Sequence, residues 1–337
     1  MRAISLAGLV YVAMCGVVLE ARAQDSSPYM ASPSAEASII LRCIDQTGQP
    51  VSEAAVSSAL YPDGSFVNAI VNNGNTDSNG CFAMKGRTAG EYSFGLTKNG
   101  YYKTRMVRHL SREKAASVVS GRWQPYGMTN TVILKRIVNP VAMYAFDYMA
   151  GHALIPKVSE PLGFDLMAGD WVAPYGDGTV PDFDVTYLRD GEGREYSTLE
   201  LVLSTHSPFA GFVKIKSDNY SAFKSPHHAD TNAVYEREIR FSFKKQPYGK
   251  GGHRYVDGQM TADECIILRT RTRLDRDGRL AGAHYGKIYG PMYFGVARNA
   301  PGSVKMLHYL NPTENDTNLE YDPGRNLLHP HARNSPP

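Results

Sequence analysis

The sequence predicts an all-β protein built from two β-rich domains, and three observations lead to this fold class. The chain has 337 residues, which at roughly 150 residues per domain is the length of about two domains. Short apolar runs alternate with turn residues along most of the chain, as they do in antiparallel strands. Tyr is abundant, at 21 residues, and long Leu-rich helical patterns are missing.

The first 23 residues have the features of a secretory signal peptide. Arg2 precedes a nearly continuous apolar run from Ala3 to Leu19, and Ala21-Arg22-Ala23 is a small-x-small cleavage site. The apolar run is at the lower limit of the length that spans a bilayer, so a membrane anchor is the alternative. We expect cleavage after Ala23 and a secreted or periplasmic protein with no membrane span once the signal is removed.

Residues 24–36 are rich in Ser, Pro and Ala and are predicted to form a flexible leader. From residue 37 onward, the turns between apolar runs carry Gly, Asn or Asp, which tolerate a positive φ. The expected strands cover residues 38–44, 54–61, 66–71, 81–84, 91–97, 101–107 and 131–136. Seven short strands at this spacing predict an antiparallel sandwich. Residues 111–120 are expected to be an insertion with one or two helical turns.

Four motifs follow one another in this region. Residues 43–56 (CIDQTGQPVSEAAV) resemble the pattern V-x-D-x-x-G-x-P-V-x-x-A-x-V, and residues 76–82 (TDSNGCF) resemble T-D-x-x-G-x-F. Residues 90–92 and 98–101 resemble a closing G-x-Y and K-x-G-Y. In this order and spacing, the motifs resemble carboxypeptidase regulatory-like domains over residues 37–137.

This resemblance implies a transthyretin-like sandwich of seven strands. Its motifs serve turns, at Gly48 and Gly80, and the core, at Val51, Val56 and Phe82. The family uses the module as an accessory or spacer in enzymes, receptors and adhesins, so the resemblance does not determine function.

The Asn139-Pro140 pair marks the domain boundary, since the residue before a proline is biased towards extended conformation. Residues 138–325 are predicted to form a second β-rich domain, either a sandwich or a jelly roll, and residues 326–337 a disordered tail. The expected strands cover residues 142–149, 183–188, 198–204, 211–216, 234–244, 265–274, 279–288 and 305–309. Within this domain, residues 163–178 resemble a segment of uncharacterised secreted bacterial proteins.

The mature chain would carry Cys43, Cys81 and Cys265. An exported protein can form disulfides, and Cys43 with Cys81 is the one pair expected within a single domain. Strand alternation disfavours this pair: when Cys43 points into the sandwich with Ile39 and Leu41, Cys81 points out. We therefore expect free thiols, with the Cys43–Cys81 disulfide as the alternative.

Charge and motifs argue against two function classes. The formal net charge of +3 gives no electrostatic case for a nucleic-acid partner. None of the 10 histidines begins a His-x-x-Glu zinc pair, and neither His-Glu-x-x-His nor Gly-x-Ser-x-Gly occurs. The sequence therefore predicts no enzyme activity, no catalytic residue and no cofactor.

Two groups of residues are candidates for ligand binding. Trp171 and Tyr175 share a Gly- and Pro-rich segment and would stack on a sugar ring, although core packing of Trp171 is the competing interpretation. Arg269, Arg271 and Arg273 alternate along one expected strand, which would place three guanidinium groups on one face to dock an anionic glycan. A cross-strand charge ladder is the competing interpretation.

Candidate metal ligands are weaker. Asp170, Asp177, Asp182 and Asp184 crowd one segment and would offer oxygens to Ca²⁺, but their spacing matches no known Ca²⁺ loop and favours turn formation. The His227-His228 pair would hold one ion only from a loop, because adjacent strand residues point to opposite faces. We predict no metal site.

The sequence thus predicts an exported, non-catalytic binding or structural protein that recognises a carbohydrate or a component of the cell envelope. Two alternatives stay open. One is a glycan-active hydrolase with paired carboxylates in the C-terminal domain, since the separation of such a pair is a property of the fold. The other is a subunit that assembles with further envelope proteins.

Overall fold

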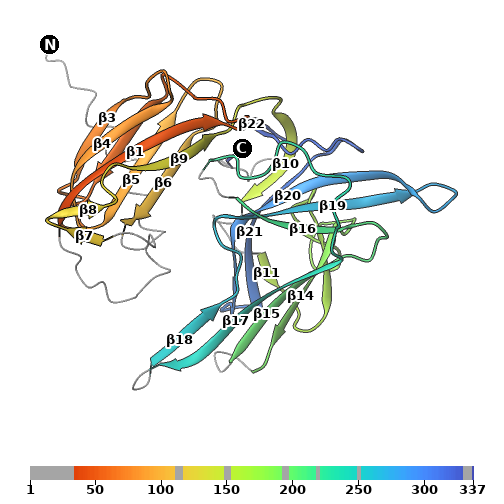
Figure 1. The fold of residues 1–337 in the computed structure, drawn as a ribbon. Helices are drawn as coiled ribbons and strands as arrows, with labels where there is room; N and C mark the ends of the chain where they lie inside the picture. Colours follow the sequence, from red (N-terminus) through yellow and green to blue (C-terminus); the bar gives the residue numbers. More distant parts are fainter. Residues whose placement is uncertain are drawn as a thin grey trace, which may run out of the picture.

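The computed structural model describes residues 34–110, 117–147, 153–191, 197–217, 221–248, 252–328 and 336–337. This described chain forms strands β1 to β22 and no α-helix, in four sheets that pack as two sandwiches (Figure 1). The predicted all-β fold class is confirmed. The predicted signal peptide and most of the leader lie outside the described residues. In the described ranges, no helix has the length and apolar character needed to cross a membrane.

The N-terminal sandwich packs a five-stranded sheet against a four-stranded sheet. The five-stranded sheet has the order β4 (Cys81–Thr88), β1 (Ala35–Asp45), β8 (Arg122–Gln124) and β7 (Ser117–Val119), and β9 (Met128–Leu134) also pairs with β1. The four-stranded sheet has the order β3 (Ile70–Asn75), β2 (Ala55–Leu60), β5 (Glu91–Thr97) and β6 (Thr104–His109). Apolar side chains of both sheets, including Ile39, Leu41, Tyr92 and Phe94, form the core between them.

The segment predicted to form helical turns contributes a strand instead. Residues 117–119 form β7, which pairs with β8 in a short hairpin, whereas residues 111–116 lie outside the described residues. The hairpin places Trp123 in the core, and its indole N–H donates to the Thr88 carbonyl at 3.0 Å. Burial of this large ring stabilises the hairpin. The neighbours of Trp123 in the sequence are polar, so they gave no indication of a strand here.

Cys43, Cys81 and Cys265 are free thiols in this structure. Cys43 is buried on the inward face of β1 beside Ile39 and Leu41, as strand alternation predicts, and Cys81 is partly exposed. Burial raises the pKa of the Cys43 thiol to about 12.

Gly80 occupies a turn that admits no side chain. Its φ is +74°, and an added Cβ would lie 2.3 Å from the carbonyl oxygen of Cys43. Gly48 has a similar φ of +82° but has nothing within 4 Å of its Cβ position. It therefore serves as a matched control that isolates the effect of backbone conformation.

We expect Gly80→Ala to lower the free energy of unfolding by about 3 kcal/mol or more, since it adds a backbone clash to the strain of a left-handed residue. Gly48→Ala should cost about 1 kcal/mol, the strain alone. Urea unfolding of both variants measures the difference. Equal losses would mean that the 77–81 turn moves freely and that its packing against β1 is unimportant.

The C-terminal sandwich packs a seven-stranded sheet against a six-stranded sheet. The first has the order β16 (Gly211–Lys216), β19 (Glu264–Leu274), β20 (Leu280–Gly295), β21 (Gly302–Leu310), β10 (Val141–Asp147) and β22 (Tyr321–Asn326), with β11 (Ala153–Ile155) paired to β21. The second has the order β13 (Asp170–Trp171), β12 (Pro161–Asp165), β14 (Phe183–Arg189), β15 (Thr198–Ser204), β17 (Glu238–Tyr248) and β18 (Gly252–Asp257). Two packed sheets agree with both architectures expected for this part, since a sandwich and a jelly roll each have two sheets.

Both faces of the seven-stranded sheet are buried. One face packs on the six-stranded sheet through residues such as Ile266, Leu268 and Ile288. The opposite face carries a second apolar cluster that includes Cys265 and Tyr289. The ordered chain continues past β22, where the Leu327 N–H donates to the Met143 carbonyl at 3.0 Å; residues 329–335 of the expected tail lie outside the described part.

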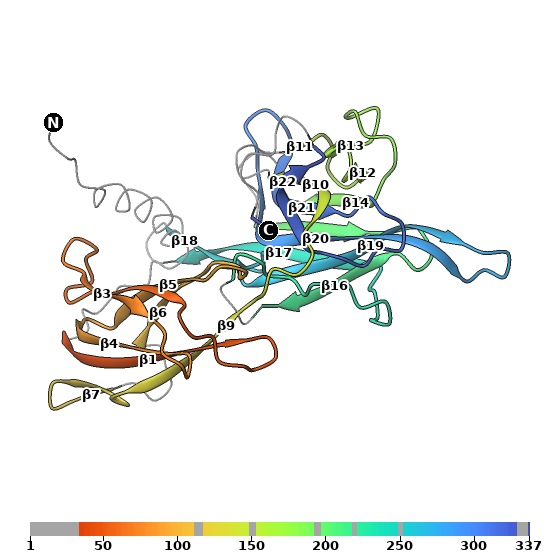
Figure 2. The same ribbon diagram turned by 90° about the horizontal axis from the view of Figure 1, so that it is seen from above.

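The two sandwiches meet along residues 221–228. Figure 2 shows β9 running from the N-terminal sandwich towards the C-terminal sheets. Beside this connection, the Ala222 N–H donates to the Lys103 carbonyl at 2.8 Å, and the rings of Phe223 and Tyr102 lie 5.0 Å apart. The Tyr102 hydroxyl also donates to the carboxylate of Glu320 at 2.7 Å. We call these contacts between the two sandwiches the joint.

Candidate functional site

A shallow, open hollow lies at one end of the four-stranded sheet. Strand pairing places Ala55 beside both Asn75 and Thr97, so the three side chains form a row on the outer face of the sheet. The hollow above this row has a volume of about 480 Å³. Its other lining residues are Glu53, Lys98, Asn99, Tyr101 and Lys103.

Hydrogen bonds hold two charged side chains of the hollow, Glu53 and Lys98, in place. The Asn75 amide donates to the Glu53 carboxylate at 3.1 Å, and the Lys98 ammonium donates to the Ser52 carbonyl at 2.5 Å. Lys103 is exposed and has no ion-pair partner among the described residues. Two lysines against one glutamate leave the lining with a net positive charge.

The Tyr101 ring is held by its neighbours at the edge of the hollow. The guanidinium group of Arg136 lies 5.0 Å from the ring centre, and it also donates to Asp45 at 2.9 Å. The hydrogen bond from Thr47 and the Arg136 guanidinium outweigh burial and hold the pKa of Asp45 well below its usual range. The ring offers an apolar surface for stacking, and the amides and the two ammonium groups of the lining offer donors to a polar, negatively charged ligand.

The two aromatic candidates from the sequence lie in different environments. Trp171 is only 4% exposed, packs edge-on against Phe164 at 5.2 Å between ring centres, and donates its indole N–H to the Leu154 carbonyl at 2.8 Å. Tyr175 is 40% exposed. Of the expected stacking pair, Tyr175 alone therefore presents its ring to solvent, and Trp171 fits the competing core interpretation.

The three candidate arginines do not form one stripe. A bulge between Thr270 and Arg273, with Arg271 at a φ of +49°, interrupts the alternation of β19. Arg269 is buried over the Tyr235 ring at 4.0 Å, Arg271 binds two aspartates, and Arg273 pairs with an exposed glutamate. A bulge of this kind cannot be recognised in an alternating sequence. The three arginines were therefore expected on one face of the strand.

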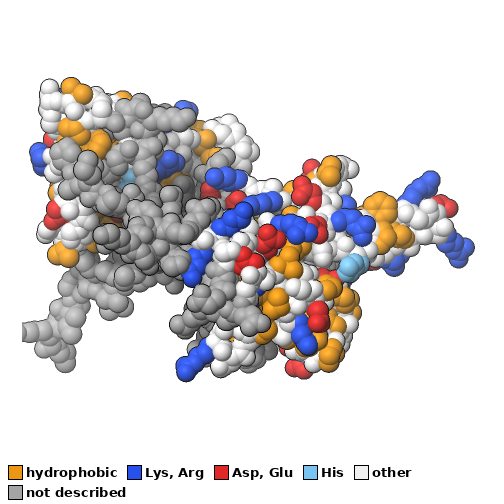
Figure 3. Space-filling model, turned by 90° about the horizontal axis from the view of Figure 1, so that it is seen from below, with side chains coloured by type: hydrophobic (Ala, Val, Ile, Leu, Met, Phe, Trp, Pro, Cys, Tyr) orange, Lys and Arg blue, Asp and Glu red, His pale blue; other side chains and the backbone are white. Residues whose placement is uncertain are grey.

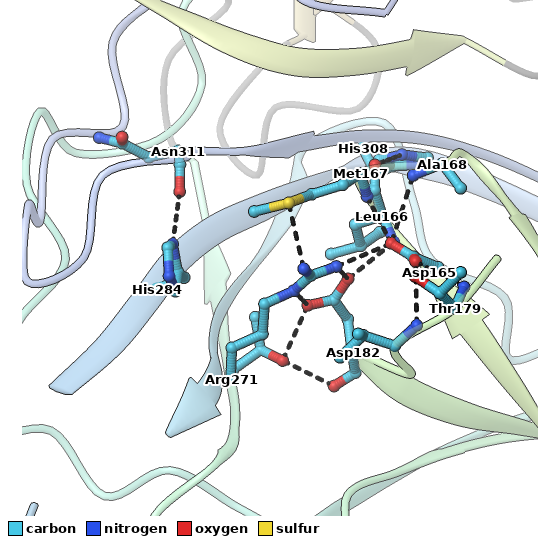
Figure 4. Close-up of polar contacts among 12 residues, drawn as sticks. Asp165, Leu166, Met167, Ala168, Thr179, Asp182, Arg271, His284, His308 and Asn311 are labelled. Atoms are coloured by element: carbon cyan, nitrogen blue, oxygen red, sulfur yellow. Dashed lines mark hydrogen bonds and ion pairs between the residues drawn. The ribbon is translucent and has the colours of Figure 1, made fainter. Parts of the chain in front are cut away.

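Arg271 is the centre of a buried ionic network (Figure 4). Its guanidinium group donates to Asp182 Oδ1 at 2.8 Å and Oδ2 at 3.0 Å, and to Asp165 Oδ1 at 2.7 Å. Asp165 also accepts from four backbone N–H groups, at Met167, Ala168, Thr179 and Val180. These hydrogen bonds and the Arg271 charge outweigh burial and hold the pKa of Asp165 below its usual range.

The geometry of this network does not suit proton transfer. A general acid for glycoside hydrolysis needs a raised pKa and an open carboxyl group, whereas the side chains of Asp165 and Asp182 are 4% and 0% exposed and bound by Arg271. The burial and bonding of this carboxylate pair give no support to the hydrolase alternative.

Three of the four candidate metal-ligating aspartates bind protein groups through their carboxylates. Asp170 accepts from the Trp171 and Asp177 N–H groups, Asp182 binds Arg271, and Asp184 pairs with His206. Within the described ranges, no cluster of three or more His, Cys, Asp or Glu side chains has a geometry that would hold a metal ion.

The two adjacent histidines have separate partners. His227 Nε2 lies 2.9 Å from the Arg136 carbonyl oxygen, and His228 Nδ1 lies 3.2 Å from the hydroxyl oxygen of Thr317.

The C-terminal face seen from below in Figure 3 carries Lys and Arg side chains interspersed with Asp and Glu. The C-terminal sandwich contains ion pairs between such side chains, including Lys214 with Glu264 at 2.9 Å and Lys216 with Asp263 at 3.1 Å. Charge of one sign does not gather here in the way an electrostatic docking surface for a glycan would require.

Comparison with known proteins yields weak likenesses. No protein-family model matches the chain, and no curated protein matches it significantly. Among solved structures, 3-chlorocatechol 1,2-dioxygenase from Rhodococcus opacus 1CP aligns with a TM-score of 0.26 and 10% identity over 32% of this chain and 63% of the dioxygenase. The chain thus spans less than two thirds of that enzyme.

Two pilins are also among the similar structures. A point mutant of the shaft pilin SpaA from Lactobacillus rhamnosus GG aligns with a TM-score of 0.22 and 15% identity over 52% of this chain and 89% of the pilin. BcpA, the major pilin subunit of Bacillus cereus, aligns with a TM-score of 0.22 and 12% identity over 80% of this chain and 95% of the pilin. Likenesses of this size carry no information about function.

Neither the hollow nor the joint was predicted from the sequence. Tyr101 belongs to the K-x-G-Y motif, which was interpreted as a folding element alone, and the lysines of the hollow are scattered among turn residues. A signal was present in the turn at residues 98–101, where Lys98, Asn99 and Tyr101 place a cation, an amide and a ring together.

Proposed function

We propose that this protein is an exported, non-catalytic binding protein that recognises an acidic carbohydrate of the cell envelope through the hollow of its N-terminal sandwich. The observation that carries the proposal is the lining of the hollow, where the fixed ring of Tyr101 lies among polar side chains and an excess of positive charge. Sugar rings stack on aromatic side chains, and their hydroxyl and carboxylate groups bind amides and ammonium groups.

The N-terminal sandwich would be the carboxypeptidase regulatory-like module that its motifs resemble. Gly48 and Gly80 have the positive φ that their turns require, and Val51 and Val56 are buried in the core as the motif implies. The joint supports a spacer role, since hydrogen bonds and ring contacts connect the module to the C-terminal sandwich.

A binding assay on the mature chain, residues 24–337, tests the proposal. The probes are a uronic-acid polysaccharide and a neutral dextran, with titration calorimetry for affinity and a reducing-sugar assay for turnover. We expect saturable binding of the acidic polymer without release of reducing ends. Binding should weaken at least about tenfold in Lys103→Ala, because one charge-assisted hydrogen bond is worth about 1.5 to 3 kcal/mol.

Lys85→Ala is the matched control, since Lys85 is an exposed lysine on β4 in the other sheet. It should bind as the unmodified protein does. Equal weakening of binding in both variants would mean that the polymer binds through general charge attraction and not at the hollow. Loss of binding in Tyr175→Ala but not in Lys103→Ala would place the site in the C-terminal sandwich, and release of reducing ends would make the protein an enzyme.

A further inference from the structure

A buried lysine lies behind the joint. Lys287 of β20 is 0% exposed. Its Nζ lies 4.4 to 4.7 Å from the ring centres of Phe223, Tyr289 and Tyr309, and 2.7 Å from the Tyr289 hydroxyl oxygen. Phe223 belongs to the segment that contacts the N-terminal sandwich, so the joint covers this amine.

Two further lysines converge on the same rings from other parts of the chain. Lys135, just after β9, lies with its Nζ 5.2 Å from the centre of Phe223 and donates to the Ser225 carbonyl at 2.7 Å. Lys224 lies with its Nζ 5.6 Å from the centre of Tyr289 and donates to the Gly290 carbonyl at 2.7 Å. Both bonds use neutral acceptors, so they supply no compensating negative charge.

The charge around these amines is poorly balanced. The carboxylate of Glu320 stabilises the charge on Lys287, and the neighbouring Lys135 opposes it. Asp263 stabilises the charge on Lys224, but its own side chain is 37% exposed and pairs with a different lysine. Three amines therefore depend on two carboxylates, of which Glu320 alone is buried.

Glu320 is also engaged by other groups. The Tyr102 hydroxyl donates to its carboxylate at 2.7 Å, and the imidazole of His227 lies 3.9 Å away. Its negative charge is therefore shared between the joint and the three lysines Lys135, Lys224 and Lys287, which we call the amine cluster.

Burial makes the charged form of each amine costly. It lowers the pKa of Lys135 to about 8, lowers that of Lys224, and lowers that of Lys287 well below its usual range. Cys265 lies near all three lysines, and burial raises the pKa of its thiol to about 12. Burial likewise raises the pKa of Tyr289.

We propose that the joint is a pH-responsive latch, in which residues 221–225 close over Lys287 while the amine cluster carries fewer than three charges and loosen when it takes up protons. The geometry supports this, because the same segment supplies the Phe223 ring over Lys287, the acceptor of Lys135 and the backbone contact with Lys103. Opening the segment returns the amines to water.

The direction of the effect follows from proton binding. An open joint exposes lysines with a pKa near 10.4, so the open form binds more protons than the closed form below that pH. Lowering the pH therefore favours opening. For Lys135 alone, a closed-state pKa of about 8 gives about a tenfold increase in the opening constant from pH 9 to pH 6, and Lys287 adds to it.

Hydrogen exchange measured by mass spectrometry tests the latch on the mature chain. The readout is the opening constant of the Ala222 N–H, corrected for intrinsic exchange, with amides of the β1–β4 pair as an internal reference. A Cys265→Ala background removes the thiol, which titrates in the opposite direction. We expect the opening constant to rise at least tenfold from pH 9 to pH 6, and the rise to shrink in Lys287→Met.

The outcomes separate the latch from other causes. A pH-independent opening constant overturns the proposal, and so does a rise that Lys287→Met leaves unchanged. A rise abolished by His227→Gln assigns the effect to the imidazole and overturns it as well. If Lys287→Met does not fold, Lys135→Met replaces it, and a rise that shrinks about tenfold in that variant supports the latch.

Discussion

Arg271→Ala is expected to lower the free energy of unfolding by about 3 to 5 kcal/mol, which is the usual cost of removing one partner of a buried ion pair. The guanidinium group is the cation that faces both Asp165 and Asp182, and the side chains of those residues are 4% and 0% exposed. Without Arg271, the two carboxylates would remain buried close to each other. Their negative charges would then have no positive partner.

The location of the network increases this effect. Asp165 ends β12, Asp182 precedes β14, and Arg271 lies in the bulge of β19, so the ion pairs connect the two sheets of the C-terminal sandwich. The Thr270 hydroxyl adds a bond of 2.9 Å to the Asp182 carbonyl. Loss of Arg271 therefore removes the ion pairs and also weakens the packing of one sheet on the other.

Arg273→Ala is the matched control on the same strand. Arg273 pairs with Glu314 at 3.1 Å, but their side chains are 60% and 40% exposed. An exposed pair of this kind contributes at most about 1 kcal/mol. Urea unfolding monitored by tyrosine fluorescence compares the two variants. If Arg271→Ala costs no more than Arg273→Ala, water reaches the network and its apparent burial has no energetic consequence.

Local pattern predicted most of the strands, because exposed and buried side chains alternate along a strand. The strand expected at residues 66–71 is an exception, since β3 begins only at Ile70. Each of the eight strands expected after residue 140 has a counterpart, from β10 to β21. The strands that were missed are short or lie at sheet edges, such as β11 and β13, where few residues carry the alternation.

The joint and the Arg271 network could not be predicted from local pattern, because their partners are far apart in the sequence. Lys135 binds Ser225, and Tyr102 binds Glu320, across separations of 90 and 218 residues. Each residue taken alone is an ordinary strand or loop residue. Their roles depend on how two sandwiches come together, which alternation and turn chemistry do not specify.

Glu320→Ala is expected to uncouple the two sandwiches and to destabilise the joint by about 3 kcal/mol, since it leaves a buried donor without its acceptor. Glu320 is 1% exposed and belongs to the C-terminal sandwich. Its carboxylate accepts from the Tyr102 hydroxyl at 2.7 Å, from the Val138 N–H at 2.8 Å and from the Asn139 N–H at 2.5 Å. Tyr102 belongs to the N-terminal sandwich. Val138 and Asn139 lie in the connection between the two sandwiches, from β9 to β10.

This placement makes the shape of the unfolding curve informative. While Glu320 holds the connection, the stability of each sandwich depends on the other, and unfolding in urea should be a single transition. Glu320→Ala should separate it into two transitions, because domains without a strong interface unfold independently. Tyr102→Phe removes one of the three bonds and should cost about 1 kcal/mol, with the transition still single.

A double-mutant cycle between Glu320→Ala and Tyr102→Phe isolates the bond between them from the effects on the connection. Because the two groups are in contact, their effects should not add, and the coupling should be about 1 kcal/mol. Additive effects together with a single transition in Glu320→Ala would show that other contacts, such as Phe223 on Tyr102, hold the joint. The carboxylate would then act on the amine cluster through its charge and not through its hydrogen bonds.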